Sequence, residues 1–406
     1  MVNKVIATAF CTSVFDGTHD TPKPSLTGHP LITSKHIMNN RINYEDAYLI
    51  SEEDYADVQK RSAVSKWDVL FTMIGTVGEI YLEKNDKIPY AIKNMGVFSC
   101  GDGYKAKWLF YYLKSPFAKK YISNYLSGAV QKFVPLGFLR NFPIIPFDES
   151  KKKIVELLYN LDSKIELNNK INTELESMAK TIFDYWFLQF EFPNSEGKPY
   201  KSSGGKMVWN EKLKREIPEG WDTEMLFDAM DVQYGFPFST TKFTEKITDI
   251  PIVRIRDILE NTISIYTTEE TDEKYKLFKQ DLLIGMDGNF HLNFWDKDGS
   301  YLNQRSVRIR PQKDSTISNL CVYFELYPYI KAKEKNISRT TVGHLSDKDL
   351  KRLFLLKAKE NVNFTPKKTF DSILEKIVSN RIEIQQLSEI RDFLLPMLMN
   401  GQVVVN

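Results

Sequence analysis

The chain has 406 residues, of which 42% are hydrophobic and 27% are charged, and its formal net charge is only +2. This length predicts two or three domains. The small net charge excludes a uniformly basic protein, so any nucleic-acid surface must come from local placement of Lys and Arg. The three cysteines and five histidines show neither disulfide nor metal-ligand spacing, so we expect no structural metal. No apolar run reaches the ~20 residues of a membrane span and no signal peptide is evident, which predicts a cytoplasmic protein without a membrane partner.

A first mixed domain is predicted over residues 1–147. Short β-branched and aromatic runs at Asp68–Ile74 and Gly78–Leu82 are typical of strands, and Trp108–Tyr125 is typical of a helix. Because strands and helices are interspersed, we assign this domain to the α+β class.

A long helix is predicted to follow over residues 148–190. Asp148 can cap its first turn, apolar residues recur every three or four positions, and the helix runs into the aromatic segment Phe183–Phe187. The next stretch is polar and rich in Gly, Ser and Lys, so residues 191–216 are predicted to form an exposed connector.

The second half of the chain repeats this order. Residues 217–364 are predicted to form a second α+β domain that opens at Ile217–Trp221. Within it, Val307–Ile309 is typical of a strand and Val322–Glu334 of a helix.

A second long helix is predicted over residues 365–401. Pro366 lies in its first turn, where proline is tolerated. Pro396 is expected to kink or end this helix, because a proline inside a helix removes a backbone hydrogen bond.

Three pairs of similar segments indicate an internal repeat. They occur in the same order in the two halves and at a nearly constant separation of about half the chain, which a chance match would not produce. The pairs are Pro30–Ile37 with Pro251–Ile258, Asp68–Gly75 with Asp281–Gly288, and Leu139–Ile145 with Leu350–Leu356.

The two long helices share one heptad register, which predicts that they pair with each other as an antiparallel coiled coil. In this register Asn168 of the first helix matches Asn380 of the second, and an Asn at a seam position costs stability but selects register and partner. The predicted interface residues are Leu158, Leu161, Ile165, Asn168, Leu175, Ile373, Ile377, Asn380, Leu387 and Leu394. We expect Asp at Leu161 and Ile373 to separate the helices before it harms either domain. The alternative is two ordinary amphipathic helices, each packed on its own domain.

Motifs for catalysis are missing from the sequence. We find no phosphate-binding loop, no nucleophile elbow and no nuclease-like carboxylate cluster. Asp16 and His19 could act as acid and base, but ordinary turn chemistry accounts for them more simply. We therefore predict no catalytic residue.

Several basic and polar positions could contact DNA, because Lys and Arg bind phosphates and Arg, Asn and Gln read base edges. A strand over Val307–Ile309 would place Arg308 and Arg310 on one face, as a basic ribbon above a core. Arg254 and Arg256 have the same spacing, and Lys35 matches Arg256 in the repeat. The predicted DNA contacts are Thr18, His19, Lys35, Gln131, Lys132, Arg254, Arg256, Arg308, Arg310, Arg339 and Thr340.

The chain resembles a known family, the specificity subunits of Type I restriction–modification systems. The resemblance covers nearly the whole chain, and the helix patterns are its most specific part. The segments that carry it are Asp16–Pro22, Ser127–Val134, Leu161–Asn169, Ile217–Trp221 and Arg391–Pro396.

The resemblance implies that each domain is a target recognition domain that reads one half of a split sequence in double-stranded DNA. It implies that the helix pair docks two methyltransferase subunits and that two motor-nuclease restriction subunits join the complex. The chain itself would hold no cofactor, whereas its partners would bind S-adenosylmethionine, ATP and Mg²⁺. Because Gly235–Phe238 departs from its counterpart Gly17–Asp20, we expect the two halves to read different bases. A helix of about 30 residues is ~45 Å long, which suits half-sites about one DNA turn apart.

Two other functions remain open at the sequence level. The chain could be an orphan or truncated specificity subunit, or a coiled-coil scaffold whose two domains bind protein only. A steep salt dependence of DNA affinity would separate DNA binding from the scaffold function.

Overall fold

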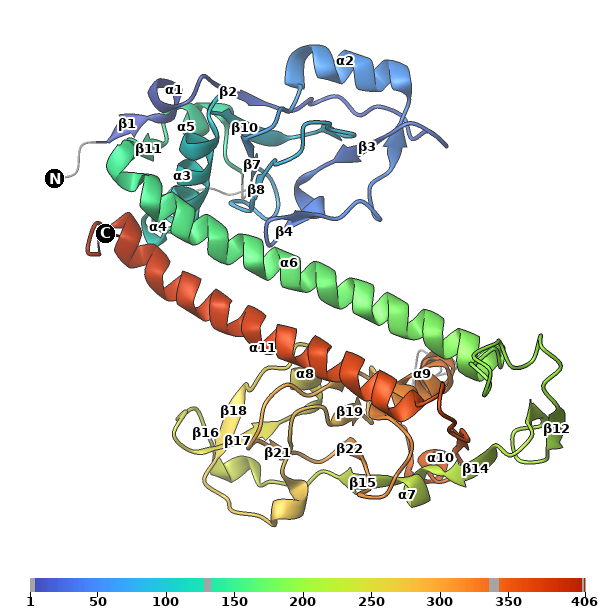
Figure 1. Ribbon diagram of the computed structural model, residues 1–406. Helices are drawn as coiled ribbons and strands as arrows, with labels where there is room; N and C mark the ends of the chain where they lie inside the picture. Colours follow the sequence, from blue (N-terminus) through green and yellow to red (C-terminus); the bar gives the residue numbers. More distant parts are fainter. Residues whose placement is uncertain (1–3, 128–132, 336–342, 404, 406) are drawn as a thin grey trace. The chain divides into compact units, whose positions relative to one another are not determined.

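The protein consists of two compact units in the computed structural model, which describes residues 4–127, 133–335, 343–403 and 405. Unit 1 is formed by Met1–Lys164 together with Leu387–Asn406, and unit 2 by Ile165–Gln386. Each long helix therefore gives one part to each unit (Figure 1). From the sequence, the helical segments 148–190 and 365–401 are predicted to be separate from the two domains. In the structure each of them is divided between the two units.

Unit 1 is an α+β structure built on a four-stranded antiparallel sheet, as predicted. Its strands are β1 (Val5–Ile6), β2 (Ser13–Asp16), β3 (His29–Ile32), β4 (Ile37–Met38), β5 (Arg41–Ile42), β6 (Leu49–Ile50), β7 (Asp68–Thr72), β8 (Ile80–Leu82), β9 (Ala91–Ile92), β10 (Met95–Ser99) and β11 (Pro143–Ile144). Its short helices are α1 (Ala7–Phe10), η1 (Ser34–His36), α2 (Glu52–Ser62), α3 (Gly103–Lys114), α4 (Pro116–Leu126) and α5 (Leu136–Arg140). The main sheet has the order β2-β10-β7-β8, and a small sheet has the order β6-β3-β9 with β3 and β9 parallel.

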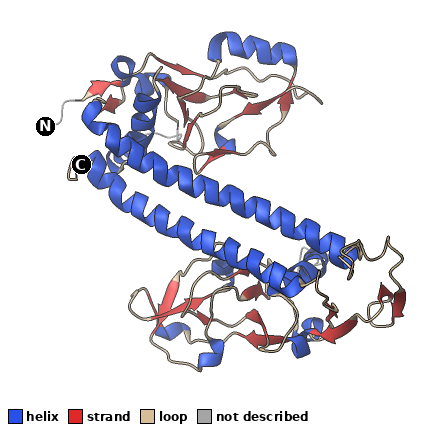
Figure 2. Cartoon of the chain, viewed as in Figure 1, coloured by secondary structure: helices blue, strands red, loops and turns tan. Residues whose placement is uncertain are grey.

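Unit 2 contains the same kinds of element (Figure 2). Its strands are β12 (Met207–Asn210), β13 (Arg215–Pro218), β14 (Asp222–Met225), β15 (Met230–Tyr234), β16 (Phe243–Thr244), β17 (Ile250–Val253), β18 (Ile265–Thr267), β19 (Leu282–Gly285), β20 (Leu292–Phe294), β21 (Tyr301–Leu302), β22 (Ser306–Pro311) and β23 (Phe354–Lys357). Its short helices are α7 (Leu226–Ala229), η4 (Thr240–Lys242), α8 (Ile255–Ile258), η5 (Glu273–Tyr275), α9 (Asn319–Lys335) and α10 (Asp347–Leu350). The main sheet has the order β15-β22-β19-β20.

The strand orders confirm the predicted repeat. The sheet β15-β22-β19-β20 of unit 2 matches β2-β10-β7-β8 of unit 1 strand for strand, and the parallel pair β17 with β21 matches β3 with β9. The pair β14 with β23 matches β1 with β11. A local detail also recurs. Asp68 begins β7 and Asp281 directly precedes β19, and each carboxylate accepts a hydrogen bond from the backbone N–H of the residue three positions earlier.

Two predicted segments differ from the structure. The single helix expected over Trp108–Tyr125 is two helices, α3 and α4, because Pro116 forces Ser115 into an extended conformation that ends the first helix. The segment predicted as a connector over 191–216 contains strand β12 and the start of β13, which pair as a hairpin. Its polar composition hid this pairing.

The long helices are α6 (Lys152–Phe183) and α11 (Pro366–Met399). A short helix, η2 (Glu149–Lys151), leads into α6 with Asp148 as its cap, and a π-helical turn, η3 (Asp184–Leu188), follows it. Helix α11 continues through Pro396, which contradicts a break at that residue. The proline lies in the last turn, and Gly401 then closes the helix with a φ of 71° and a backbone bond from Gln402 to Met397.

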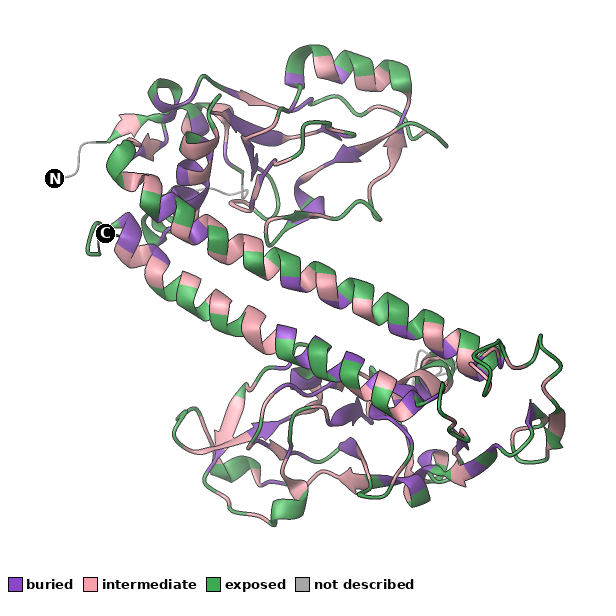
Figure 3. Ribbon diagram, viewed as in Figure 1, coloured by how far each residue is buried: buried purple, intermediate pink, exposed green. Residues whose placement is uncertain are grey.

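Both long helices are built into the cores of the units (Figure 3). In unit 1 the buried residues Leu158 of α6 and Leu398 of α11 belong to the cluster beneath the main sheet and α3. In unit 2, Phe183, Phe370 and Ile373 belong to the cluster that also contains the main sheet and α9. Asp at Ile373 would therefore damage unit 2 itself, and the expectation that it spares the domains is wrong.

Polar side chains join α6 to α11 within each unit. In unit 2 the buried Asn380 donates to Asn172 Oδ1 at 2.8 Å, and Asn168 donates to Glu383 Oε2 at 2.7 Å. Asn168 and Asn380 are thus both buried, but each has a different partner from the one that their shared register suggests. In unit 1, Arg391 of α11 donates to Asp162 of α6 at 2.7 Å. Low-numbered residues of one helix meet high-numbered residues of the other, so the pairing is antiparallel.

The remaining predicted interface residues are partly buried. This group is Leu161, Ile165, Leu175, Leu387 and Leu394. Ile377 is buried in the core of unit 2, like Ile373. Within unit 2, the buried apolar residues Ile373 and Ile377 therefore lie on the same helix as Asn380 and its polar contact with α6.

Glu325 of α9 gives unit 2 a predictable pH dependence. It lines a largely apolar pocket that also contains Arg215, and it accepts a hydrogen bond from Leu356 N at 3.2 Å. Desolvation in this pocket raises the pKa of Glu325 to about 8 from its ordinary 4.5. The folded state then binds one more proton than the unfolded state between these values. Stability should fall as pH rises through that window, by up to ~1.4 kcal/mol per pH unit.

The measurement is thermal unfolding of the wild type and of Glu325→Gln across this pH range. The wild type should lose stability relative to the variant as pH rises, because glutamine has no proton to release. Parallel curves for the two proteins would contradict a proton held on Glu325.

Within the described ranges, none of the helices combines the length and apolar character that crossing a lipid bilayer would require.

Candidate nucleic-acid interface

The first group of predicted contacts lies where β2 leads into the following loop. His19 is exposed over 59% of its side chain, and its ring is held by Asp16 Oδ2 at 3.0 Å and Asn94 Oδ1 at 2.8 Å. Thr18 is only 7% exposed, and its hydroxyl accepts the backbone N–H of Asp20. His19 can therefore meet a ligand directly, whereas Thr18 holds the loop in shape.

Lys35 and Arg256 occupy matching places in the two units. Lys35 lies in η1 directly after β3, and Arg256 lies in α8 directly after β17. Both side chains are exposed, and neither has an ion-pair partner among the described residues. A cation without an ion-pair partner, repeated at the same topological position, suits contact with a phosphate. Such a cation can bind the phosphate without first breaking an ion pair within the protein.

Arg254 has a different environment from Arg256. The expectation of alternating strand positions is wrong here, because β17 ends at Val253 and Arg254 caps helix α8. Its guanidinium is bound to Ser264 Oγ at 2.5 Å and lies 3.7 Å from Asp257. Arg254 therefore stabilises the turn that presents Arg256.

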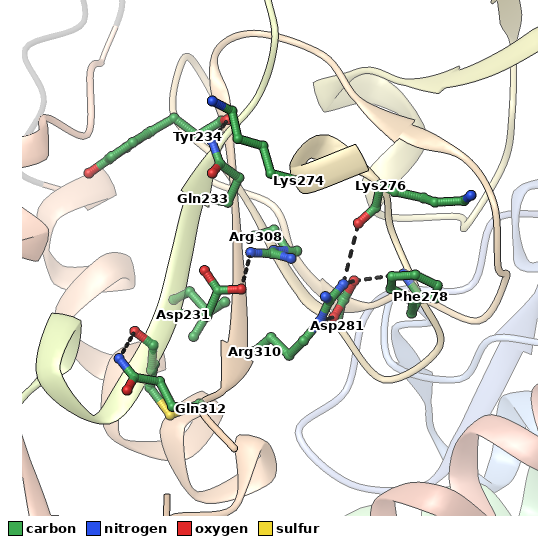
Figure 4. Close-up of polar contacts among 12 residues, drawn as sticks. Asp231, Gln233, Tyr234, Lys274, Lys276, Phe278, Asp281, Arg308, Arg310 and Gln312 are labelled. Carbon is green, nitrogen blue, oxygen red and sulfur yellow. Dashed lines mark hydrogen bonds and ion pairs between the residues drawn. The ribbon is translucent and has the colours of Figure 1, made fainter. Parts of the chain in front are cut away.

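Burial does not alternate along strand β22, where Val307, Arg308 and Ile309 are all buried, and its arginines are engaged inside unit 2 (Figure 4). Arg308 is 3% exposed and donates to Asp231 Oδ2 at 2.5 Å. Arg310 forms two hydrogen bonds of 2.6 Å with the buried carboxylate of Asp281. Desolvation lowers the pKa of Arg308 and raises that of Asp281.

The basic ribbon predicted for this strand is therefore not an open surface. DNA contact by Arg308 or Arg310 stays a prediction, and the structure adds a cost to it, because each guanidinium would have to leave a carboxylate.

Four predicted contacts lie outside the described residues: Gln131, Lys132, Arg339 and Thr340. The described residues that follow these two segments of the chain are equivalent in the two units. Phe133 forms a β-bridge with Ile74 in unit 1, and His344 forms one with Asp287 in unit 2. In each bridge one residue, Ile74 or Asp287, belongs to the segment that follows a central strand of the main sheet.

A charged cluster that sequence reasoning missed surrounds the bridge in unit 2. Asp287 binds Arg305 Nη1 at 2.7 Å and His344 Nδ1 at 2.6 Å. Partial desolvation opposes ionisation of Asp287, but these two hydrogen bonds outweigh it and lower the pKa of the carboxyl. The only sequence signal for Arg305 is its place beside a basic strand. Asp287, Arg305 and His344 are too far apart in the sequence to suggest that they form a cluster.

No group of three or more metal-ligating side chains occurs in the part of the chain that the structure describes.

The model of the family "Type I restriction modification DNA specificity domain" matches residues 19–177 and 218–355. The first match includes β7, β8 and β10 of the main sheet of unit 1, and the second includes all four strands of the main sheet of unit 2. The chain belongs to this family. Its duplicated fold and its paired helices are therefore those of a specificity subunit with two repeated domains.

Similar proteins agree with this membership. The chain is 25% identical over 403 residues to the MjaIX specificity subunit of Methanocaldococcus jannaschii. This alignment covers 93% of this chain and 87% of that protein. It is 22% identical to the HindI specificity subunit of Haemophilus influenzae, over 92% of this chain and 94% of that protein. The crystal structure of the Type I S subunit from M. genitalium has the same fold, with a TM-score of 0.56, 17% identity and coverage of 98% of this chain and 95% of that one.

Proposed function

We propose that this chain is the DNA-specificity subunit of a Type I restriction–modification complex and that each unit reads one half of a split target. The observation that carries the proposal is the match of the DNA specificity family to both units of a duplicated fold. Lys35 and Arg256 support it, because each unit has one exposed cation without an ion-pair partner at the same position, and such a cation suits contact with a phosphate.

The chain acts in this proposal without a catalytic centre of its own. It docks two adenine methyltransferase subunits and two restriction subunits in the cytoplasm. Those partners bind S-adenosylmethionine, ATP and Mg²⁺. The names of the similar proteins, which are specificity subunits of restriction enzymes, support such a division of labour.

Exposed apolar side chains on the long helices support docking. Ile390 and Phe393 of α11 in unit 1 are 48% and 69% exposed, and Leu167 of α6 in unit 2 is 52% exposed. Ile390 and Phe393 lie three residues apart, so they are neighbours on the helix surface, and adjoining apolar side chains of this kind suit a surface that a partner covers.

The test is co-purification with the methyltransferase subunit encoded beside it, followed by transfer of labelled methyl groups from S-adenosylmethionine to duplex DNA. We expect a stable complex that methylates DNA only when both chains are present. Methylation or cleavage of DNA by this chain alone would contradict the proposal. A stable complex that never binds DNA would favour the scaffold function.

Removal of the matched cations should weaken DNA binding without a change of sequence preference. For Lys35→Ala and Arg256→Ala, we expect the slope of log affinity against log salt to fall by about 1 each, because one phosphate contact is lost in each variant. The double variant should lose about 2. The measurement is a salt titration of the complex on duplex DNA.

Lys60→Ala is the matched control for this titration. Lys60 is also an exposed helical cation of unit 1, but it is paired with Asp57 at 2.6 Å. Its removal should leave the slope unchanged. An equal loss in all three variants would show a general effect of charge and would remove Lys35 and Arg256 from the interface.

A further inference from the structure

One position of the duplicated fold carries different chemistry in the two units. The turn that joins β9 to β10 in unit 1 has Asn94 before β10, and the matching turn in unit 2 has Arg305 before β22. Both residues have left-handed backbone conformations, with φ of 53° and 64°. Asn adopts this conformation readily, whereas for most other residues it costs on the order of 1–2 kcal/mol. Lys214 and Gln280 of unit 2 share this conformation, so Arg305 is set apart by the contacts of its side chain.

The carboxylate of Asp287 orients the side chain of Arg305. The carboxylate of Asp287 is 16% exposed and binds one end of the guanidinium at 2.7 Å, while the Arg305 side chain remains 69% exposed. One carboxylate contact leaves the other N–H donors of the planar guanidinium open to solvent. Arg305 is thus presented outward by a partner that fixes its direction.

Backbone bonds fix the segments that carry this cluster. Met286 N donates to the carbonyl of Arg305 at 2.9 Å, and Leu345 N donates to the carbonyl of Met286 at 2.8 Å. His344, which is 61% exposed, binds the second oxygen of Asp287. Two other segments of unit 2, at 286–287 and 344–345, therefore hold the segment of Arg305 in place. Such support is expected of a preorganised recognition group.

At the matching position unit 1 has no arginine. The exposed guanidinium of Arg61 lies 3.8 Å from Asp16, which also binds His19, but Arg61 belongs to α2 and not to the turn before β10. Asn94 takes the place of Arg305, and its side-chain oxygen is occupied by His19. The bridge that corresponds to Asp287 with His344 is formed by Ile74 and Phe133, whose side chains are 42% and 40% exposed. The bridge is therefore apolar in unit 1 and charged in unit 2, and the turn residue is an amide in unit 1 and a guanidinium in unit 2.

We propose that Arg305 reads a guanine edge in the half-site of unit 2, with Asp287 as its positioning residue. A guanidinium donates in parallel to O6 and N7 of guanine in the major groove, and no other base edge offers it two such acceptors. Unit 1 lacks this reader, so the matching base pair of its half-site is chosen differently. The proposal rests on the proposed function, because it assumes that each unit reads one half-site.

The test is selection from a random duplex DNA library by the complex of this chain with its methyltransferase subunit. The variant is Arg305→Asn, which installs the residue of unit 1 and suits the left-handed turn. We expect one G·C pair of a single half-site to become degenerate while the other half-site stays unchanged. Affinity for the wild-type target should fall about 10- to 100-fold. Asp287→Asn should give a smaller loss at the same base pair.

Lys214→Asn is the matched control. Lys214 is an exposed cation of unit 2 with a left-handed φ of 52°, and its side chain is paired with Glu211. Its motif should equal that of the wild type. A wild-type motif that Arg305→Asn leaves intact, or a uniform loss of affinity over all sequences, would overturn the assignment of Arg305 alone. A wild-type complex that enriches no sequence would overturn the proposed function.

Discussion

Replacement of Phe370 by Ala is expected to destabilise unit 2 by about 3–5 kcal/mol. Phe370 of α11 is fully buried, and its ring centroid lies 5.9 Å from Trp186 and 6.1 Å from Phe187. It also meets Phe183 at 6.4 Å. Truncation would leave a cavity among rings that cannot close over it, because they are fixed in α6, in η3 and in the core of the unit. Chemical denaturation followed by tryptophan fluorescence measures the loss.

Phe393→Ala is the control for this prediction. Phe393 lies on the same helix but is 69% exposed, so its truncation should change stability by no more than about 0.5 kcal/mol. Comparable losses in the two variants would show that the packing of α11 in unit 2 is not as described.

Replacement of Arg310 by Met should cost a similar amount, about 3–5 kcal/mol. Asp281 is 1% exposed, and Arg310 provides its two short side-chain hydrogen bonds. Methionine keeps the length of the side chain but leaves the carboxylate buried without a cation. Lys279→Met is the control, because Lys279 forms an exposed pair with Asp298 at 3.2 Å that should contribute about 1 kcal/mol or less.

The double variant Arg310→Met with Asp281→Asn separates folding from DNA binding. It removes both charges, so most of the lost stability should return. If the refolded double variant binds its target as well as the wild type does, Arg310 is a structural ion pair and not a DNA contact. A failure of the double variant to regain stability would contradict the pairing of Arg310 with Asp281.

The helices and the repeat were predictable because their signals are local or periodic. Apolar positions every three or four residues mark α6 and α11, and similar segments at a constant separation mark the matching strands β7 and β19. These patterns record which face of an element is buried, and burial of one face is enough to define a helix or strand.

The roles of individual arginines were not predictable in the same way. Arg308 finds Asp231 at a separation of 77 residues, and Arg310 finds Asp281 at 29 residues. An arginine with a distant carboxylate and an arginine open to solvent look alike in a sequence. Arg305 shows the converse case, since only its left-handed turn and its contact with Asp287 set it apart from its neighbours.

The central claim is that two units of one chain read two halves of a split DNA sequence. Co-expression of this chain with its methyltransferase subunit, followed by genome-wide mapping of methylated adenine, tests it most directly. The account predicts one motif made of two specified half-sites separated by a short unspecified spacer. Methylation at a single continuous motif, or methylation without any motif in a complex that contains this chain, would contradict it.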